Sequence, residues 1–287
     1  MGAILHPYPR SVMPSHAQHL PSSLILVGAG KMGGSMLEGW LKVGMKPAGV
    51  TVIDPHPSDE MTRFCAQRGI ALNPAKPLAP DVLVLAVKPQ MLDEAAAPLN
   101  ALLGPGTLII SILAGKTIGN LRSRLPSAAA IVRAMPNLPA SIGRGATGAA
   151  ASPEVGEEQR LMADALLSSN GIVEWLDSED LIDAVTALSG SGPAYVFHLV
   201  ECLAEAGAAA GLPPDLAQRL ARATVTGAGE LLFQSDLPPA TLRQNVTSPG
   251  GTTAAALEVL MSEEQGLKAL MREAVAAAKR RAGELSG

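Results

Sequence analysis

The sequence predicts an α/β fold in which a doubly wound, mostly parallel sheet is followed by an all-helical C-terminal domain. Three observations lead to this prediction. Before residue 179, short continuous apolar runs alternate with helix-length segments, which is typical of parallel strands covered by helices on both faces. A glycine-rich turn directly follows the first of these runs. After residue 179 the strand patterns stop, and the chain continues as helical segments rich in Ala and Leu.

The first apolar run, residues 24–27, leads into the pattern Gly28-x-Gly30-x-x-Gly33, and an amphipathic run begins at Met36. This order of buried strand, glycine turn and helix is the Rossmann-type dinucleotide-binding arrangement. Gly28 makes the tight turn, and Gly30 lets the backbone approach a pyrophosphate at the helix N-terminus. Gly33 lets the helix pack close to the strand. The alternative is a strand–helix turn that is merely rich in glycine.

Further apolar runs predict the remaining strands and the edge of the sheet at which a ligand binds. A run at residues 50–53 ends in Asp54, and Ser58 with two acidic residues after it marks a helix start. Four more strands are predicted, at residues 70–72, 81–87, 107–111 and 130–136. Ligands of such sheets bind outside the carboxyl ends of the strands. The site is therefore expected at residues 28–33, 86–89, 111–115 and 135–137.

The predicted helical domain contains two unusual stretches. Residues 189–195 are Ser-Gly-Ser-Gly-Pro-Ala-Tyr, and such weak helix formers indicate either a close helix crossing or a ligand contact. Residues 245–253 precede a helix predicted to start at Ala254, and they form either an ordinary capped loop or an anion nest. The apolar spacing of residues 267–278 indicates a helix packed in the core, with residues 279–281 as its basic last turn.

Composition excludes several classes of partner. The formal net charge of −4 provides no electrostatic footprint for nucleic acid or for an anionic membrane. The most apolar long stretch, residues 184–200, is interrupted by Gly and Pro, so we expect no membrane span. Cys65 and Cys202 are too few for a structural zinc site and form no CxxC motif. This usage suits a reducing compartment, and we expect a cytoplasmic protein without a metal site.

Residues 1–23 differ from everything after them, because they contain three of the five histidines and show no apolar periodicity. They lack the continuous apolar core of a signal peptide. We expect a disordered extension here rather than a metal-binding segment. The dinucleotide-binding domain is then expected over residues 24–178 and the helical domain over residues 179–287.

Four stretches, taken together, resemble pyrroline-5-carboxylate reductase. The most specific is residues 183–197, Asp-Ala-Val-Thr-Ala-Leu-Ser-Gly-Ser-Gly-Pro-Ala-Tyr-Val-Phe, which is similar to the signature of that family. The others are residues 246–253, 86–90 and 135–137. Any one of them could arise by chance, but four in the right order identify the family, and the similarity runs from about Leu24 to Leu285.

The resemblance implies reduction of L-1-pyrroline-5-carboxylate, a small cyclic imine, to L-proline by hydride transfer from NADPH or NADH. This is the last step of proline biosynthesis. The resemblance also implies a homodimer with interlocked helical domains, which can assemble further into a decamer. The helical domain would therefore serve both substrate binding and dimerisation.

Site residues also follow from the resemblance. The loop from Ser248 to Thr252, including Gly250 and Gly251, would hold the substrate carboxylate, and the Thr253 hydroxyl would hydrogen-bond the ring nitrogen. Glu179 would lie near the substrate. Cofactor contacts, together with Gly33 and Asp54 of the motif, are implied at Val27, Gly28, Ala29, Gly30, Lys31, Met32, Asn73, Ala86, Val87, Lys88, Pro89, Leu113 and Ala114.

These roles agree with the chemistry of the side chains. A Thr hydroxyl donates or accepts a hydrogen bond, but it is a poor acid, so we expect Thr253 to orient the ring and relay a proton rather than act as a full general acid. A carboxylate nest would position the imine for an effectively unimolecular hydride transfer. The cofactor carries the redox chemistry, and no metal is needed.

Cofactor preference stays open between NADH and NADPH. Asp54 should pair with the hydroxyls of an NAD ribose and repel a 2′-phosphate. Members of the family often prefer NADPH and have small or basic residues in this region. A carboxylate turned away, with Arg63 on the phosphate, is the alternative.

Two other functions are compatible with a dinucleotide-binding domain. A β-hydroxyacid dehydrogenase needs a lysine in the middle of an interdomain helix, and residues 182–210 contain no lysine. A regulatory nucleotide-binding protein that has lost catalysis is the second rival. The intact stretch at residues 248–253 argues against it.

Overall fold

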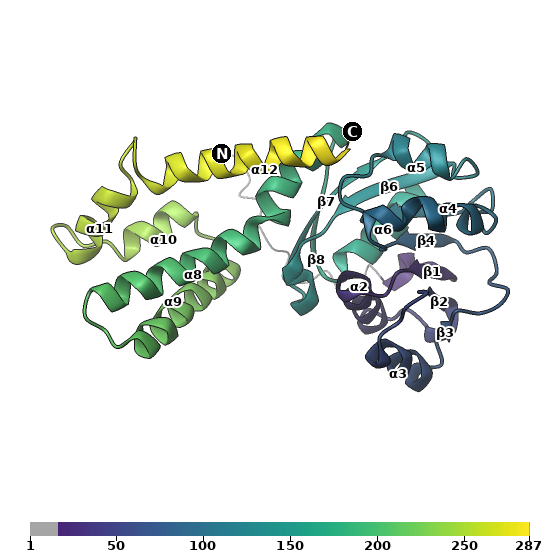
Figure 1. The fold of residues 1–287 in the computed structure, drawn as a ribbon, viewed down its shortest axis with the longest axis horizontal. Helices are drawn as coiled ribbons and strands as arrows, with labels where there is room; N and C mark the ends of the chain where they lie inside the picture. The colour runs from purple at the N-terminus through teal and green to yellow at the C-terminus, as the bar shows by residue number, and fades with distance from the viewer. Residues whose placement is uncertain (1–16, 287) are drawn as a thin grey trace. The chain divides into compact units, whose positions relative to one another are not determined.

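The computed structural model describes residues 17–286, which divide into two compact units. Of these residues, the sheet unit contains 17–190 and 279–286, and the helical unit contains 191–278. Figure 1 shows the elements of both units along the chain.

The sheet unit is built on eight strands that pair in the order β3-β2-β1-β4-β5-β6-β7-β8. The strands are β1 (Leu24–Val27), β2 (Val50–Ile53), β3 (Ala71–Leu72), β4 (Val82–Leu85), β5 (Leu108–Ser111), β6 (Ala130–Met135), β7 (Gly145–Ala151) and β8 (Gly171–Trp175). The first six are parallel, β7 is antiparallel to β6, and β8 is parallel to β7. The predicted fold class and the six predicted strands are confirmed.

The sequence did not reveal β7 and β8. β7 consists of Gly, Ala and Thr and therefore shows no apolar run. Its small side chains have a packing reason, because a Cβ at Gly148 would lie 2.8 Å from the side chain of Val185. Gly and Ala have a low intrinsic preference for strands, so the sequence of β7 does not predict one. The close contact with Val185 becomes visible only in the structure.

Helices cover both faces of this sheet. They are α2 (Lys31–Lys42), α3 (Asp59–Arg68), α4 (Leu92–Asn100), α5 (Ile118–Arg124), α6 (Glu157–Ser168) and α7 (Ile182–Val185). Alternate side chains of β1 point into two cores: Leu24 and Leu26 pack with α2, α3 and α6, and Ile25 and Val27 pack with α4 and α5. The fully buried Trp40 of α2 donates its indole N–H to Leu166 O of α6 at 2.9 Å.

Short helical turns connect these elements. They are η1 (Ala17–His19), η2 (Pro47–Gly49), η3 (Pro89–Met91), η4 (Leu138–Ile142), η5 (Glu179–Leu181) and the π-helical turn η6 (Thr186–Gly190). The helix start predicted at Ser58 is confirmed, because the Ser58 hydroxyl accepts from Met61 N–H at 3.1 Å.

The sequence predicted a first domain of residues 24–178. The sheet unit extends beyond both limits, because it begins before residue 24 and continues past residue 178. The predicted disordered extension lies outside the described residues as far as residue 16, but Leu20 packs against the core under α2 and α6 and Pro21 is buried. At the other limit, Ile182 and Ala187 are buried in this unit. The segments around Leu20 and Ile182 are too short to show an apolar periodicity in the sequence. Their packing in the structure therefore decides that they belong to the sheet unit.

The helical unit consists of α8 (Gly192–Ala209), α9 (Pro214–Gln234), α10 (Pro239–Asn245), α11 (Thr252–Leu260) and most of α12 (Leu267–Ser286). α11 begins at Thr252, two residues before the predicted start. α12 continues past residue 281 to Ser286, so residues 279–281 are not its last turn. No helix of the described chain is both long and apolar enough to cross a membrane.

The expectation that residues 267–278 pack in a core is wrong for the single chain. Leu267 and Leu270 are 44% and 60% exposed. Among residues 191–278, which the structure describes throughout, the buried hydrophobic residues are Ala217 and Ala221. Apolar spacing predicts that a helix face is buried but does not tell which surface covers it.

Candidate functional site

The turn between β1 and α2 has the geometry that a nucleotide pyrophosphate requires. Gly28 has φ +90°, and a Cβ there would lie 2.8 Å from the backbone of Ala86. A Cβ at Gly33 would lie 2.2 Å from Gly28 O, whereas nothing lies within 4 Å of one at Gly30. Gly30 is the N-cap of α2 and provides no side-chain cap, so the first N–H groups of α2, from Lys31 on, are available to an anion.

Asp54, at the carboxyl end of β2, is bound to this turn. Its Oδ2 accepts from Ala29 N–H at 2.8 Å, and its Oδ1 accepts from His56 N–H at 2.9 Å. Each carboxylate oxygen has a second lone pair, so a ribose hydroxyl can still donate to it. Arg63, the alternative partner of a 2′-phosphate, is exposed and donates its Nε–H to Asp59 O of its own helix.

Asn73 holds the backbone of Asp54 in place. Its Nδ2 donates to Asp54 O at 2.7 Å, and its Oδ1 accepts from Asp54 N–H at 2.9 Å. With φ +49°, Asn73 is the single non-glycine residue at positive φ among those described, a conformation that Asn tolerates better than most residues. Both side-chain polar atoms of this predicted cofactor residue are thus already bonded to the backbone of Asp54.

The predicted cofactor residues after β4 and β5 lie at the same edge of the sheet. Ala86 N–H donates to Val27 O at 2.8 Å, which keeps residues 86–89 beside the glycine turn. Leu113 is buried and Ala114 is exposed. Because β3, β2, β1, β4 and β5 are consecutive neighbours, their carboxyl ends bring together Gly28–Gly33, Asp54, Asn73, Ala86–Pro89 and Leu113 with Ala114.

The fourth predicted strand end, residues 135–137, has a structural role. Asn137 is buried, its Nδ2 donates to Ser189 O at 3.0 Å and its Oδ1 accepts from Ala146 N–H at 2.9 Å. A Cβ at Gly190 would lie 3.0 Å from Met135 Cε. Met135 Cε is the end of a flexible side chain that can move, so this contact does not by itself require glycine at position 190. The π-helical turn around Gly190 is a form often found at functional sites.

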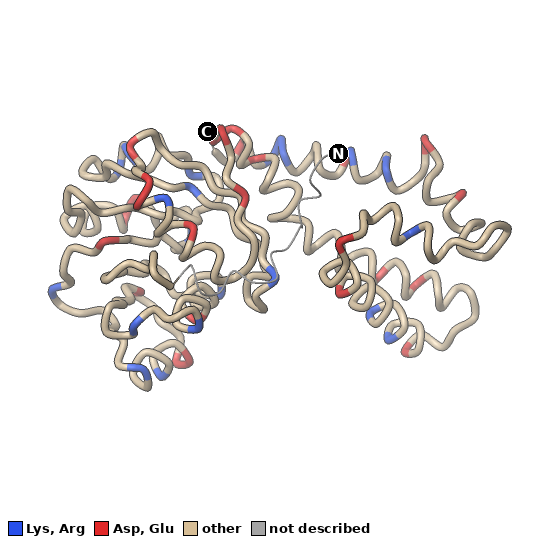
Figure 2. The backbone as a smooth tube through the Cα atoms, turned by 180° about the vertical axis from the view of Figure 1, so that it is seen from behind, with Lys and Arg blue, Asp and Glu red and all other residues tan. Residues whose placement is uncertain are grey.

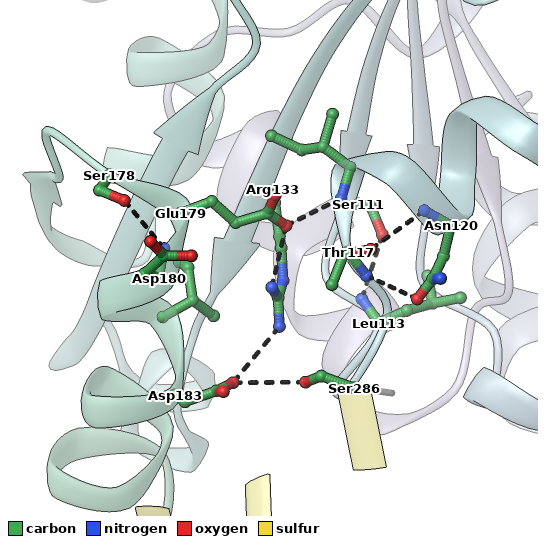
Figure 3. A network of polar contacts seen from close by, with 12 residues as sticks. Ser111, Leu113, Thr117, Asn120, Arg133, Ser178, Glu179, Asp180, Asp183 and Ser286 are labelled. Atoms are coloured by element: carbon green, nitrogen blue, oxygen red, sulfur yellow. Dashed lines mark hydrogen bonds and ion pairs between the residues drawn. The ribbon is translucent and has the colours of Figure 1, made fainter. Parts of the chain in front are cut away.

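Glu179 belongs to a group of four residues in the sheet unit, which we name the anchor cluster: Arg133, Glu179, Asp183 and Ser286 (Figure 3). Glu179 Oε1 accepts from Arg133 Nη1 at 2.9 Å and from the backbone N–H of Ile118 at 2.8 Å. Arg133 Nη2 lies 3.8 Å from Asp183 Oδ1, which accepts from the Ser286 hydroxyl at 3.3 Å.

Arg133 is the residue of this site that sequence reasoning missed. Its side chain is 4% exposed, and its Nε has no hydrogen-bond partner. The signal was present, because an arginine inside an otherwise apolar strand of a parallel sheet must have a buried partner. Sequence alone does not tell which carboxylates those partners are.

The predicted substrate loop lies in the helical unit and ends at the N-terminus of α11. Gly250 has φ +68°, and Gly251 N–H donates to Ser248 O at 3.0 Å. Gly251 is the N-cap and has no side-chain cap bond. Thr252, exposed, and Thr253, half-buried, open the first turn. Uncapped N–H groups after a glycine turn form the kind of nest that binds a carboxylate.

The described residues contain no group of His, Cys, Asp and Glu side chains arranged to hold a metal ion. The sheet unit has the glycine turn, the acidic residue after β2 and the strand order of a dinucleotide-binding domain. With a helical unit following it, the fold defines a nicotinamide-dependent oxidoreductase of two domains.

Comparison with known proteins defines the family. The family model described as "Pyrroline-5-carboxylate reductase dimerisation" matches residues 179–285, and that described as "NADP oxidoreductase coenzyme F420-dependent" matches residues 23–115. Pyrroline-5-carboxylate reductase of Pseudomonas aeruginosa is 38% identical over 92% of this chain and 96% of its own. That of Synechocystis is 47% identical over 71% of this chain and 75% of its own.

Solved structures agree. Pyrroline-5-carboxylate reductase from Coxiella burnetii is 37% identical with a TM-score of 0.85, covering 93% of this chain and 99% of its own. The Plasmodium falciparum enzyme, solved with NADP bound, is 28% identical with a TM-score of 0.75, covering 92% of this chain and 98% of its own. The chain belongs to the pyrroline-5-carboxylate reductase family, whose members catalyse the last step of proline biosynthesis with NAD(P)H. The predicted family and reaction are confirmed.

Proposed function

We propose that this chain reduces L-1-pyrroline-5-carboxylate with a nucleotide bound at the carboxyl edge of the sheet and the imine bound at the N-terminus of α11. The observation that carries the assignment is the substrate loop, in which a glycine turn leads to an uncapped helix N-terminus with Thr252 and Thr253 in its first turn. The nicotinamide cofactor supplies the hydride, and the residues of this chain bind and orient both reactants.

The substrate carboxylate is held by the N–H groups of the loop from Ser248 to Thr252, including those of Gly250 and Gly251. The Thr253 hydroxyl hydrogen-bonds the ring nitrogen and so orients the imine carbon toward the hydride donor. It also relays the proton that the nitrogen gains during the reduction. An iminium accepts hydride better than a neutral imine does, so a site that keeps this nitrogen hydrogen-bonded favours the reactive form.

The nucleotide pyrophosphate lies on the N-terminus of α2, over Gly30. Asp54 faces the adenosine ribose, and its charge favours NADH because a 2′-phosphate would be repelled. Its two backbone hydrogen bonds reduce this preference, since they spread part of the carboxylate charge onto Ala29 and His56. We therefore expect both NADH and NADPH to serve.

The functional form is a homodimer with interlocked helical domains, which assembles further into a decamer. Support comes from the large apolar side chains that the helical unit leaves exposed, because such patches mark protein–protein contacts. These side chains are Val196, Phe197, Leu199, Leu203, Leu212, Leu220, Leu231, Leu232, Leu237, Val246, Val259, Leu260, Met261, Leu267 and Leu270. Acidic and basic residues, in contrast, are interspersed along the described chain (Figure 2).

The enzyme is proposed to work in the cytoplasm. Its two cysteines are unpaired: Cys65 is buried, which raises the pKa of its thiol, and Cys202 is exposed. Two unpaired cysteines suit a reducing compartment.

One assay tests the proposed function. Purified protein is mixed with L-1-pyrroline-5-carboxylate, and the loss of reduced-nicotinamide absorbance is followed in parallel with NADH and NADPH. Oxidation that depends on the imine supports the assignment. Nucleotide binding without any such oxidation would overturn it and favour the regulatory rival, and turnover of a hydroxyacid instead would favour the dehydrogenase rival.

A further inference from the structure

The loop between β5 and α5, residues 112–117, includes the two proposed cofactor contacts Leu113 and Ala114, and we name it the cofactor loop. At its start, Leu113 N–H donates to Ser111 Oγ at 3.3 Å. At its end, Thr117 and Asn120 form a reciprocal capping box with bonds of 3.0 and 3.2 Å. Both ends of the loop are therefore fixed within the sheet unit.

The middle of the cofactor loop contacts the far end of the chain. Gly115 has φ +70°, and a Cβ there would lie 2.8 Å from Leu285 O in the last turn of α12. The contact is thus between two backbones. Residues 279–286 of α12 belong to the same compact unit as the loop. The last turn of α12 therefore packs directly against the middle of the cofactor loop.

Arg133 connects the two supports of the loop. It lies near the carboxyl end of β6, paired in register with Ser111 of β5, and Figure 3 shows its guanidinium between Glu179 and Asp183. Through Glu179 it reaches Ile118 N–H, the first residue of α5, and through Asp183 it reaches Ser286 of α12. One buried cation is thus linked, through two carboxylates, to the first residue after the loop and to the last turn of α12.

The charge balance of the anchor cluster indicates a role beyond filling space. Apolar residues of similar volume would stabilise a buried position at least as well as an ion cluster does. The cluster instead sets one guanidinium against two carboxylates and leaves Arg133 Nε without a partner. Directed hydrogen bonds position neighbouring groups in a way that apolar packing does not.

We propose that Arg133 is a positioning residue for the cofactor: it holds the cofactor loop between the N-terminus of α5 and the last turn of α12. This proposal rests on the proposed function, which places the nucleotide at the carboxyl edge of the sheet, and on the nucleotide contacts that the family resemblance implies at Leu113 and Ala114. It follows that nucleotide affinity depends on the last residues of the chain. Glu179, which the resemblance placed near the substrate, acts here through the cofactor loop.

The test compares Arg133→Met and Arg133→Lys in the full chain, with nucleotide dissociation constants measured by NADPH fluorescence and with KM values for nucleotide and imine. Arg133→Met should raise the nucleotide Kd by about tenfold, because a loop displaced by a fraction of an ångström loses contacts. The imine KM should stay within about twofold. Arg133→Lys, which keeps the charge, should recover part of the affinity.

Stability is measured beside affinity, since Arg133→Met leaves the partly buried Glu179 without its cation. The double variant Arg133→Met with Glu179→Gln removes that excess charge. A lower thermal midpoint with an unchanged nucleotide Kd would overturn the proposal and leave the cluster a merely structural role.

If neither Arg133 variant folds, a chain that ends at Glu284 tests whether the last turn of α12 positions the cofactor loop. It lacks the Leu285 and Ser286 contacts and should bind nucleotide several-fold more weakly. Its matched control is Arg281→Ala, which removes an exposed ion pair with Glu284 on the same helix end and should leave the Kd unchanged. Equal affinities of the shortened and control chains would contradict the proposal.

Failure of the proposed function is detected separately. Ala114 is exposed, so Ala114→Asp should fold normally and repel a bound dinucleotide. If Ala114→Asp leaves the nucleotide Kd unchanged, the cofactor loop is no part of the site and the assignment of Leu113 and Ala114 fails. If Ala114→Asp weakens binding and the Arg133 variants do not, only the positioning role fails.

Discussion

At the scale of single residues, Thr253 and Asp54 are placed by the backbone of neighbouring residues. Thr253 is in the first turn of α11 because Gly251 ends the loop as the N-cap. Asp54 faces the glycine turn because its carboxylate accepts backbone N–H groups from both sides. The tests at this scale therefore remove one chemical group from each side chain and compare the result with a variant that keeps that group or removes the same charge elsewhere.

Thr253→Ala should lower kcat by about tenfold to a hundredfold, because the ring nitrogen loses the hydroxyl that orients it and relays its proton. Nucleotide affinity should hardly change. Steady-state kinetics and nucleotide titration measure the two effects, and Thr253→Ser, which keeps the hydroxyl, should retain most of the activity. An unchanged kcat in Thr253→Ala would remove this residue from the mechanism.

Asp54→Asn should shift the ratio of kcat/KM values toward NADPH by about tenfold, because it removes a charge that repels the 2′-phosphate. Asn keeps one oxygen that can accept from Ala29 N–H. Asp59→Asn, which removes a carboxylate from the first turn of α3, is the control with the same change of charge. If both variants shift the ratio equally, Asp54 does not read the ribose.

At the scale of elements, glycine has two different roles in the turn between β1 and α2: close packing at Gly33 and access for a ligand at Gly30. Gly33 is required by close packing, since a Cβ would lie 2.2 Å from Gly28 O. At Gly30 a Cβ would meet nothing within 4 Å, and its φ of −68° suits any residue. Only a bound pyrophosphate would therefore require glycine at position 30.

Gly33→Ala should lower the free energy of unfolding by about 1–3 kcal/mol and weaken nucleotide binding as well, because α2 must move away from β1. Gly30→Ala should keep nearly all of the stability, with a few tenths of a kcal/mol lost at the N-cap, yet weaken binding by about tenfold. Denaturant unfolding and nucleotide titration measure these effects. Tight binding by Gly30→Ala would show that no phosphate approaches this backbone.

At the scale of the whole molecule, the helical unit leaves too much apolar surface exposed for a lone chain. Phe197 and Leu231 are 57% and 63% exposed, and large exposed apolar patches mark association surfaces. A family model for dimerisation matches this part of the chain. Both facts support the proposal that another copy of the chain covers this surface.

Leu231→Glu should convert the oligomer to smaller species or prevent its folding, because a charge would be buried in the subunit contact. Light scattering coupled to size-exclusion chromatography measures the change in mass. Leu78→Glu is the control, since Leu78 is 87% exposed in the sheet unit and should leave the mass unchanged. A wild-type protein that is monomeric at assay concentration would contradict the proposed dimer.

The sequence by itself determined the sheet, the glycine turn and the family, because each of these leaves a local pattern. Continuous apolar runs mark buried parallel strands, and Gly28 and Gly33 stand where no side chain fits. β7 was not predicted, because its small residues form no continuous apolar run in the sequence.

Only the tertiary structure decided what the isolated polar residues do. Arg133 and Glu179 are 46 positions apart, and Asp183 and Ser286 are 103 apart, so no local pattern connects them. Asn73 is bonded to Asp54 from another strand end. Hydrogen bonds and ion pairs depend on distances that folding creates, whereas strands and turns depend mainly on neighbours in the chain. The sequence therefore predicted the elements, and the fold assigned the partners.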